Sequence, residues 1–443
     1  MHRNMPRNRS SSAAALLALV ASFVVSSAEA QLRIEITSGV ERPVPIAIVP
    51  FGWQGSGPTA PFDIAAVITA DLGNSGRFAP LASRDIVSRP TEPAQVNFQD
   101  WRLLEVDALL IGRLSEDAPD RYTATFQLFD IVRGEQLLGF RLTTSGAALR
   151  ATAHRIADMV FEELTGIPGV FSTRIAYITE DRSVESRRFR LIVADADGEN
   201  ARVVAESPQP LMSPAWSPDG RRIAYVSFEG NQSGIYVQTL RTGTRERVSA
   251  RAGINGAPAF SPDGRMLALT LSRDEGNLDV YTLDLGTQVL RRITESPAID
   301  TEPAWSTDGR SLYFTSDRAG GPQVYRVDAE PGARAQRITY EGTYNTRPRV
   351  SPDGEMLAIV HRDRTSDRIA ILNRDGDALQ VLTNGELDES PSFAPNGAMI
   401  IYATRDAGKG VLRSVSSDGR VRQQIASVAG DVREPVWSPF TLP

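Results

Sequence analysis

A short motif recurs six times in the second half of this 443-residue chain, at nearly constant spacing. Its full form is P-A-W-S-P-D-G. The copies begin at Pro214, Pro258, Pro303, Pro348, Pro391 and, in truncated form, Pro435, so the intervals are 44, 45, 45, 43 and 44 residues. A period of about 40–45 residues built from short strands is typical of the blades of a β-propeller. The repeat therefore predicts that residues 166–443 form a ring of small sheets.

The parts of each repeat follow one order. An apolar strand follows the motif, for example at residues 223–227, and a loop rich in glycine and aspartate leads to a second strand such as residues 280–283. A glycine turn then leads to a third strand, such as residues 292–294. The large apolar residue inside the motif is expected to pack one blade against the next. These residues are Trp216, Phe260, Trp305, Phe393 and Trp437.

The S-P-D-G part of the motif suits a hairpin turn. Proline presets φ for the first central position, aspartate suits the second, and glycine accepts the positive φ that closes the turn. The aspartates Asp219, Asp263, Asp308 and Asp353 could instead form a catalytic or calcium-binding set. Because Asn396 replaces the aspartate in one repeat, the turn chemistry favours a structural role.

The two ends of the repeat array indicate how the ring closes. Residues 174–179 match the strand that follows the motif elsewhere, yet no S-P-D-G precedes them. The missing inner strand is present at residues 435–438, and no strand follows it there. The last strand is therefore expected to complete the first blade, which gives six blades and leaves only short sheet edges.

Residues 31–165 predict a separate α/β domain before the ring. Strands are expected at residues 32–37, 46–51 and 108–112, a hairpin at 122–129 and 136–143, and helices at 63–72 and 149–164. Asp63 is the expected cap of the first helix and Gly73 its stop. The domain boundary is expected at residues 166–169, where turn residues cluster. The fold class is thus an α/β N-terminal domain followed by an all-β six-bladed β-propeller.

The first thirty residues have the pattern of a secretory signal. Arg3, Arg7 and Arg9 precede an apolar run at residues 13–25, and small residues follow up to Ala30. A run of this length is well short of the ~20 residues of a membrane-spanning helix. We expect cleavage between Ala30 and Gln31, and hence a location in the periplasm of a bacterium with two membranes.

Composition excludes several kinds of chemistry. The absence of cysteine excludes disulfides, thiolate metal sites and thiol nucleophiles. A net charge of −6 argues against a broad nucleic-acid surface. His2, His154 and His361 are the only histidines, so a histidine-based mechanism has few possible places. No cofactor or metal is expected.

Several segments resemble the TolB family of the Tol-Pal system. They are F-x-x-L-T-G-I-x-G-x-F-x-T-R-I-A-Y at residues 161–177, S-P-Q-P-L-M-S-P-A-W-S-P-D-G at 207–220 and N-G-A-P-A-F-S-P-D-G at 255–264. The resemblance covers essentially the whole mature chain. The S-P-D-G motif alone is not specific, because prolyl-peptidase propellers share it. The long S-P-Q-P-L-M-S-P-A-W run, together with this domain order, is specific.

The resemblance implies a non-enzymatic periplasmic adaptor that supports outer-membrane integrity and envelope constriction during cell division. In that family the propeller binds the peptidoglycan-associated lipoprotein Pal, and a short N-terminal segment of the mature chain binds TolA. Other outer-membrane proteins and imported protein toxins are further partners. The corresponding N-terminal segment here consists of Gln31, Leu32, Arg33, Ile34, Glu35, Ile36, Thr37, Ser38, Gly39 and Val40.

The residues that precede the motif's proline predict the partner face of the propeller. The S-P-D-G turns lie on one face of the ring, so these residues open on the other face beside the channel, where convergent polar and small groups form a binding site. The predicted Pal contacts are Leu211, Met212, Asn255, Ala257, Thr301, Glu302, Thr346, Arg347, Glu389 and Arg433. Ile254 departs from the histidine of one family member, so an apolar contact would have to substitute there.

Two classes of enzyme, a hydrolase and a lyase or metal-dependent enzyme, are the alternatives to a binding protein. A propeller-covered hydrolase needs a G-x-S-x-G nucleophile elbow and a histidine base, but the chain has no such motif and His154 is expected to be exposed on its helix. A lyase or metal-dependent enzyme could use a ring of carboxylates at the channel mouth. The candidates are Glu302, Asp388, Glu389 and Glu434. Two blades lack an acidic residue there, which favours a polar rim for a protein ligand.

Overall fold

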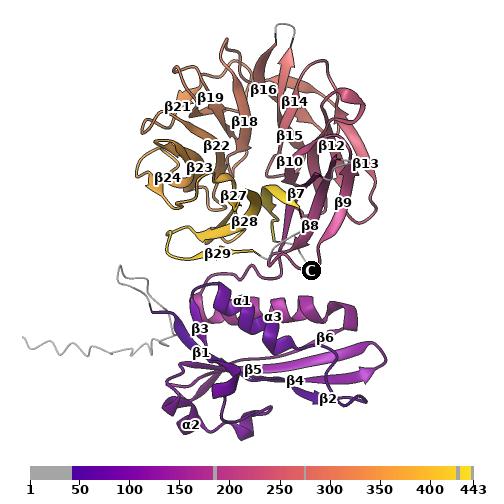
Figure 1. The fold of residues 1–443 in the computed structure, drawn as a ribbon, viewed down its shortest axis with the longest axis vertical. Coiled ribbons are helices and arrows are strands. Elements are labelled where there is room, and N and C mark those ends of the chain that lie inside the picture. Colours follow the sequence, from indigo (N-terminus) through magenta and orange to yellow (C-terminus); the bar gives the residue numbers. More distant parts are fainter. Residues whose placement is uncertain (1–41, 183–186, 274–275, 426–429, 441–443) are drawn as a thin grey trace, which may run out of the picture.

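The computed structural model describes residues 42–182, 187–273, 276–425 and 430–440. The predicted signal, its cleavage site and the N-terminal segment at residues 31–40 lie outside the described residues. An α/β domain lies beside a ring of six sheets (Figure 1), as the repeat and the strand patterns predict. No helix in the described ranges is long and apolar enough to span a bilayer.

The α/β domain is built on one six-stranded sheet of order β3-β1-β4-β5-β6, with β2 paired to β4. The strands are β1 (Val44–Ile48), β2 (Gly52–Gln54), β3 (Phe78–Pro80), β4 (Ala108–Ala118), β5 (Arg121–Asp130) and β6 (Glu135–Thr144). The strand expected at residues 46–51 is split, because Pro50 lacks the N–H that a ladder needs. The strand expected at residues 108–112 is longer, because it pairs with β5 along its whole length.

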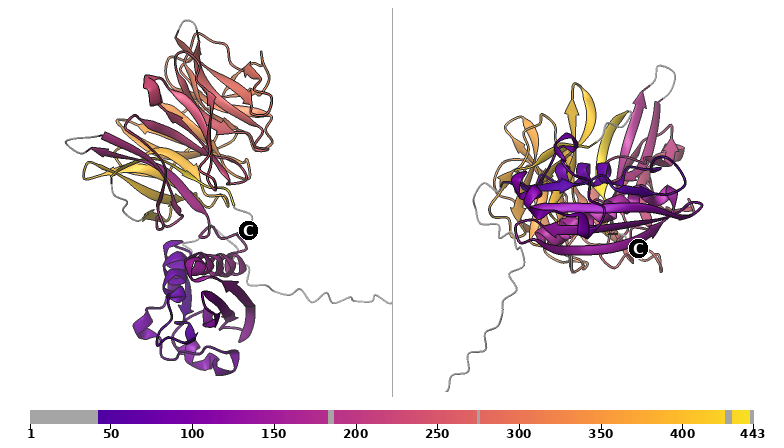
Figure 2. Two further views of the ribbon diagram at one scale, coloured as in Figure 1. Left: turned by 90° about the vertical axis from the view of Figure 1, so that its right-hand side faces the viewer. Right: turned by 90° about the horizontal axis from the view of Figure 1, so that it is seen from below.

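Three α-helices cover the two faces of this sheet. They are α1 (Ile64–Asn74), α2 (Phe98–Leu103) and α3 (Leu149–Thr165). Asp63 caps α1 as expected, since the backbone N–H of Ala66 donates to its Oδ1 at 3.0 Å. Gly166 ends α3 with φ of +71°, a conformation that glycine adopts at no steric cost. In Figures 1 and 2, α1 and α3 lie between the sheet and the propeller, whereas α2 lies on the far side.

The propeller consists of six four-stranded antiparallel sheets. Blade one contains β30 (Asp431–Trp437), β7 (Arg174–Arg182), β8 (Arg187–Asp195) and β9 (Arg202–Ser207). Blade two contains β10 (Leu211–Trp216), β11 (Arg222–Ser227), β12 (Gly234–Thr239) and β13 (Arg245–Ser249). Blade three contains β14 (Asn255–Phe260), β15 (Met266–Arg273), β16 (Asn277–Asp284) and β17 (Leu290–Arg292).

The remaining blades repeat this order. Blade four contains β18 (Asp300–Trp305), β19 (Ser311–Ser316), β20 (Gln323–Asp328) and β21 (Gln336–Arg337). Blade five contains β22 (Asn345–Val350), β23 (Met356–Asp363), β24 (Ser366–Asn373) and β25 (Gln380–Val381). Blade six contains β26 (Glu389–Phe393), β27 (Met399–Asp406), β28 (Lys409–Ser416) and β29 (Arg422–Gln424).

The last strand closes the ring as predicted. β30 pairs antiparallel with β7, with Val432 opposite Thr179 and Trp437 opposite Ile175. Backbone bonds extend the junction, because the N–H of Ser438 donates to the carbonyl of Arg174 at 2.8 Å. Figure 1 shows the result, with β27 to β29 beside β7 and β8 although they lie at opposite ends of the repeat array.

The motif aromatics join neighbouring blades. The indole N–H of Trp216 donates to the carbonyl of Val436 in blade one at 3.2 Å, and that of Trp305 donates to Ala259 in blade three at 3.0 Å. The indole of Trp437 is only half-buried, and it donates to the Thr173 hydroxyl at 2.8 Å. Trp216 and Trp305 therefore link blades by a hydrogen bond as well as by packing.

The S-P-D-G aspartates have a structural role. In the turn of blade three, Asp263 accepts from the Ser261 hydroxyl at 2.6 Å and from the Arg265 backbone at 3.0 Å. These bonds hold the pKa of Asp263 below its usual range. Asn396 keeps the backbone bond of the turn, because its side-chain oxygen accepts from the Ala398 N–H at 3.0 Å. Hydrogen bonding within the hairpin turns therefore explains the role of these aspartates.

Candidate functional site

Each inner strand of the propeller carries a bulge just before the motif's proline. The pairing register of β10 with β11 shifts between Met212 and Ala215, and the other five inner strands shift at the equivalent place. The residue before the proline has a positive φ in every blade, between 47° and 57°. The six residues are Ser213, Ala257, Glu302, Arg347, Ser390 and Glu434. Bulges re-aim side chains and are common beside functional sites.

These six residues line the central channel, a cavity of about 680 Å³. We call the end of the ring with the S-P-D-G turns the turn face, and the end where the inner strands begin the open face. The bulges bring together three of the predicted contact residues, Ala257, Glu302 and Arg347, at the open-face end of the channel. The periodicity of the sequence gave no sign of the bulges, because they repeat without changing the 44-residue spacing.

An ion-pair network spans the channel. The Arg347 guanidinium in blade five contacts Glu302 in blade four at 2.8 Å and Glu434 in blade one at 3.8 Å. It also donates to the Ser390 hydroxyl in blade six. Glu434 in turn accepts from the backbone N–H of Ser213 in blade two. Arg347 therefore connects four blades directly, and Glu434 extends the network to a fifth.

Removal of Arg347 should destabilise the propeller. In Arg347→Met, Glu302 and Glu434 lose their shared counter-ion in a confined channel. We expect a loss of about 2 kcal/mol in urea unfolding, between the values for exposed and fully buried pairs. The double variant Arg347→Met/Glu302→Gln should recover part of it. Arg374→Met is the control, since Arg374 pairs with Glu355 at 3.6 Å on the surface. Equal stability of Arg347→Met and the wild type would contradict a stabilising role of the network.

Three predicted contact residues are buried. Leu211 and Thr346 are buried in the blades, and Asn255 accepts from the Ser249 hydroxyl at 2.6 Å and donates to the Arg251 carbonyl at 2.8 Å. All three lie at the start of inner strands, where their side chains are buried and do not reach the surface. The other predicted side chains are exposed or half-buried at the open face or in the channel. These are Met212, Ala257, Thr301, Glu302, Arg347, Glu389 and Arg433.

The four carboxylates that an enzyme could have used at the channel mouth do not form a ring. Asp388 is fully buried, where it accepts from the Thr404 hydroxyl at 2.6 Å and from the Gly385 N–H at 3.0 Å. Glu302 and Glu434 are engaged by Arg347. The channel mouth is therefore a mixed polar rim, which suits a protein ligand better than a cation.

Exposed apolar side chains surround the open face. Met212, Ile254, Ile299 and Tyr340 are 39%, 51%, 47% and 71% exposed, and each lies in an inner strand or in the loop that leads to one. Large apolar side chains gathered around a polar centre are typical of protein interaction sites. Ile254, where one family member has a histidine, is one of them.

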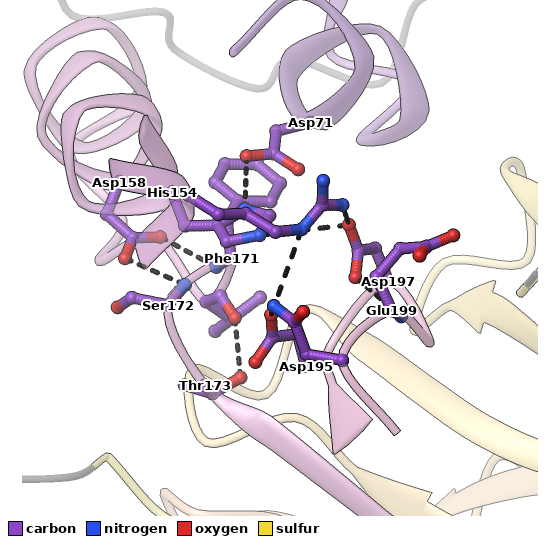
Figure 3. Close-up of polar contacts among 12 residues, drawn as sticks. Asp71, His154, Asp158, Phe171, Ser172, Thr173, Asp195, Asp197 and Glu199 are labelled. Atoms are coloured by element: carbon purple, nitrogen blue, oxygen red, sulfur yellow. Dashed lines mark hydrogen bonds and ion pairs between the residues drawn. The ribbon is translucent and has the colours of Figure 1, made fainter. Parts of the chain in front are cut away.

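A second polar cluster lies where the two domains meet (Figure 3). His154 on α3 lies between Asp71 on α1 and Asp197 in the turn after β8. Its Nδ1 is 2.7 Å from Asp71 Oδ2, and its Nε2 is 3.7 Å from Asp197 Oδ2. The expectation that His154 is exposed was wrong, because α1 and the propeller turn cover it and leave it 2% exposed. His361 is also buried, with Nδ1 2.8 Å from Asn345 Oδ1.

The cluster continues around His154. Arg150 forms an ion pair with Asp197 and lies 3.8 Å from Asp195. Asp158, one helical turn from His154, accepts from the backbone N–H groups of Phe171 at 2.7 Å and Ser172 at 3.1 Å. It therefore holds the segment that enters the propeller. Burial raises the pKa of Asp158 to about 6, although these hydrogen bonds oppose the shift.

Asp71, His154 and Asp197 offer donor atoms within 4.8 Å of one another, a spacing compatible with a metal ion. Two observations weigh against that use. Asp71 already accepts a hydrogen bond from His154, and the Arg150 guanidinium is bound to the Asp197 oxygen that faces the cluster. An arginine at a ligand oxygen repels a cation. The cluster is an ion-pair network between domains.

Comparison with known proteins gives the family. A model described as the TolB amino-terminal domain matches residues 32–137, and one described as the TolB beta propeller domain matches residues 161–441. Curated relatives named Tol-Pal system protein TolB from Xanthomonas euvesicatoria pv. vesicatoria and Xanthomonas campestris pv. campestris are each 46% identical over 429 residues. The alignments cover 96% of this chain and 97% of each relative.

A solved structure agrees with these relatives. The crystal structure of TolB from Acinetobacter baumannii is similar at 38% sequence identity and a TM-score of 0.83, covering 90% of this chain and 98% of that one. The names of these proteins indicate no catalytic activity. The resemblance seen in the sequence is therefore confirmed, and the chain belongs to the TolB family of Tol-Pal system proteins.

Proposed function

We propose that this protein is a periplasmic adaptor that binds Pal through the open face of its propeller and TolA through the N-terminal segment at residues 31–40. It would thereby support outer-membrane integrity and envelope constriction during cell division. Membership of the TolB family supports partners within the Tol-Pal system. The signal-like residues 1–30 support a periplasmic location.

The open face is the observation that carries this proposal. It combines a charged, blade-spanning network at the channel end with exposed apolar side chains around it. The α/β domain leaves this face uncovered, because its contacts are with the turn face. Asn396 in a turn of blade six donates to the Pro168 carbonyl at 2.8 Å, and Asp197 also belongs to that side.

The described residues that follow the N-terminal segment lie next to the propeller. Residues 42–44 line a cavity of about 150 Å³ together with Asp418, Arg420 and Val421 of the propeller. The first described residues after this segment therefore lie beside the domain interface. Its alternation of Leu32, Ile34 and Ile36 with polar residues suits pairing with a strand of another protein.

A bulky charge at the channel end tests the Pal site. Ala257 is a small half-buried residue that lines the channel, so Ala257→Arg should fill the channel mouth and abolish Pal binding. Thr301→Arg, in the next inner strand, should do the same. Calorimetric titration of each variant with purified Pal measures the loss.

The matched control is Thr242→Arg, which adds the same charge to an exposed turn between β12 and β13 on the turn face. It should bind Pal like the wild type, and all three variants should keep the wild-type melting temperature within a few degrees. Unchanged Pal affinity in both open-face variants would place the binding site elsewhere.

A further inference from the structure

A buried histidine, His154, lies in the contact between the two domains. The Nδ1 of His154 is bound to Asp71, which is itself buried. The Nε2 has no hydrogen-bond partner among the described residues, and it points toward Asp197 of the propeller. A neutral imidazole has only one N–H, whereas a protonated one has two. The protonation state of His154 therefore decides what faces the propeller.

We propose that protonated His154 forms a pH-sensitive electrostatic contact between the domains. We call this contact, from Asp71 through His154 to Asp197, the clasp. With both ring nitrogens protonated, it carries a positive charge between Asp71 on α1 and Asp197 on the propeller turn. When it loses a proton, the lone pair of Nε2 faces the Asp197 carboxylate and the attraction between the domains is lost. Arg150 remains bound to Asp197, so the contact loosens without breaking.

The charges around the clasp determine the direction of the effect. Burial alone would lower the pKa of His154, but the hydrogen bond and charge of Asp71 and the charge of Asp197 outweigh it, so the pKa is raised above the usual 6.5. Arg150 opposes this. Further ionisable groups around the cluster are Asp158 on α3, Asp195 on β8 and Glu199 in the following turn (Figure 3), and Arg77 lines the same pocket.

The sign follows from this raised value. A group whose pKa is higher in the folded state stabilises that state fully below its unfolded pKa, and the contribution is lost as pH rises through the folded pKa. The clasp should therefore be closed below about pH 6.5 and open progressively at higher pH. Residues 42–44 line a cavity beside the same interface, so His154 would respond to pH where the two domains are in contact.

The first measurement follows the His154 ring directly. The mature chain has only two histidines, His154 and His361, so a titration by ¹H–¹³C NMR resolves both. In Asp197→Asn the turn bond from the Glu199 N–H to the side-chain oxygen can persist, because asparagine keeps that oxygen. The His154 midpoint should fall by about 0.5–1 pH unit in this variant, about three- to tenfold in proton affinity. Glu199→Gln removes a neighbouring charge from the same turn and should leave the midpoint nearly unchanged.

The second measurement gives the distance between the two domains at different pH values. Because the chain contains no cysteine, spin labels can be attached at Arg84→Cys in the α/β domain and Arg241→Cys in the propeller, both exposed positions. Double electron–electron resonance should give a narrow distance distribution at pH 6 and a broader one at pH 9. The midpoint of this change should equal that of the His154 ring. Asp197→Asn should be broad throughout.

Asp158 provides the competing explanation, because burial raises its pKa to about 6, within the range of the experiment. In Asp158→Asn the pH dependence should persist, and in His154→Gln it should disappear. A wild-type distance distribution that is the same at pH 6 and pH 9 would overturn the proposal. So would a pH dependence that survives in His154→Gln. If His154→Gln does not fold, Asp197→Asn still decides, because it should lower the midpoint of the His154 ring and keep the distance distribution broad at both pH values.

Discussion

Deletion of residues 431–443 is expected to leave the mature protein without a stable propeller. β30 is the inner strand of blade one, and its removal leaves β7 as an unpaired edge in the centre of the ring. It also removes Val432 from the core between blades one and six, and Glu434 from the channel network. Circular dichroism and size-exclusion chromatography should show an unfolded or aggregated protein.

A single substitution on β30 tests the same closure of the ring with a smaller perturbation. Trp437 is half-buried, so Trp437→Ala should cost about 2–3 kcal/mol, below the range for a fully buried aromatic. Deletion of residues 441–443 alone, beyond the end of β30, is the control and should leave stability unchanged. A protein without residues 431–443 that stays monomeric and as heat-stable as the wild type would show that β30 does not close the ring.

Deletion of residues 31–40 is expected to abolish TolA binding. The segment carries the alternating apolar residues through which TolA would be bound, and it precedes the first strand of the described fold by only a few residues. A structural role as the first strand of the α/β domain is the competing explanation, because alternation fits pairing within the chain as well as between chains. Calorimetric titration with TolA separates them, since retained affinity after deletion would favour the structural role.

The same deletion should affect Pal binding much less. The open face lies on the side of the ring away from the domain interface, so its side chains remain in place. If the segment also docks on the protein itself, linkage limits the change in Pal affinity to the coupling energy between the two sites, typically about 1–3 kcal/mol. Pal affinity that disappears together with TolA affinity would indicate that the deletion damages the fold.

The repeat made most of the propeller predictable. Its period places the blades, and the mismatch between its two ends reveals that the last strand belongs to the first blade, because a blade needs four strands. Turn chemistry identified the role of Asp263 and its equivalents for the same reason, since the turn is a local structure. The α/β domain was predicted less accurately, because propensity does not reveal where Pro50 divides a strand or how far β4 extends.

Contacts between distant segments were not predictable. Asp71 and His154 are 83 residues apart, and Asp197 belongs to another domain, so nothing in the helix around His154 indicates burial. The positions of Glu302, Arg347 and Glu434 were predicted at the channel, but not the ion pairs that join them. These pairs depend on the bulges and on the diameter of the ring, which arise only when six blades close.

One measurement tests the two-site adaptor most directly. Purified Pal and purified TolA are each titrated calorimetrically into the mature wild type, Ala257→Arg and the protein lacking residues 31–40. The account predicts that the wild type binds both, that Ala257→Arg loses only Pal, and that the deletion loses only TolA. Loss of both partners in one variant, or of neither in both, would contradict two separate binding sites.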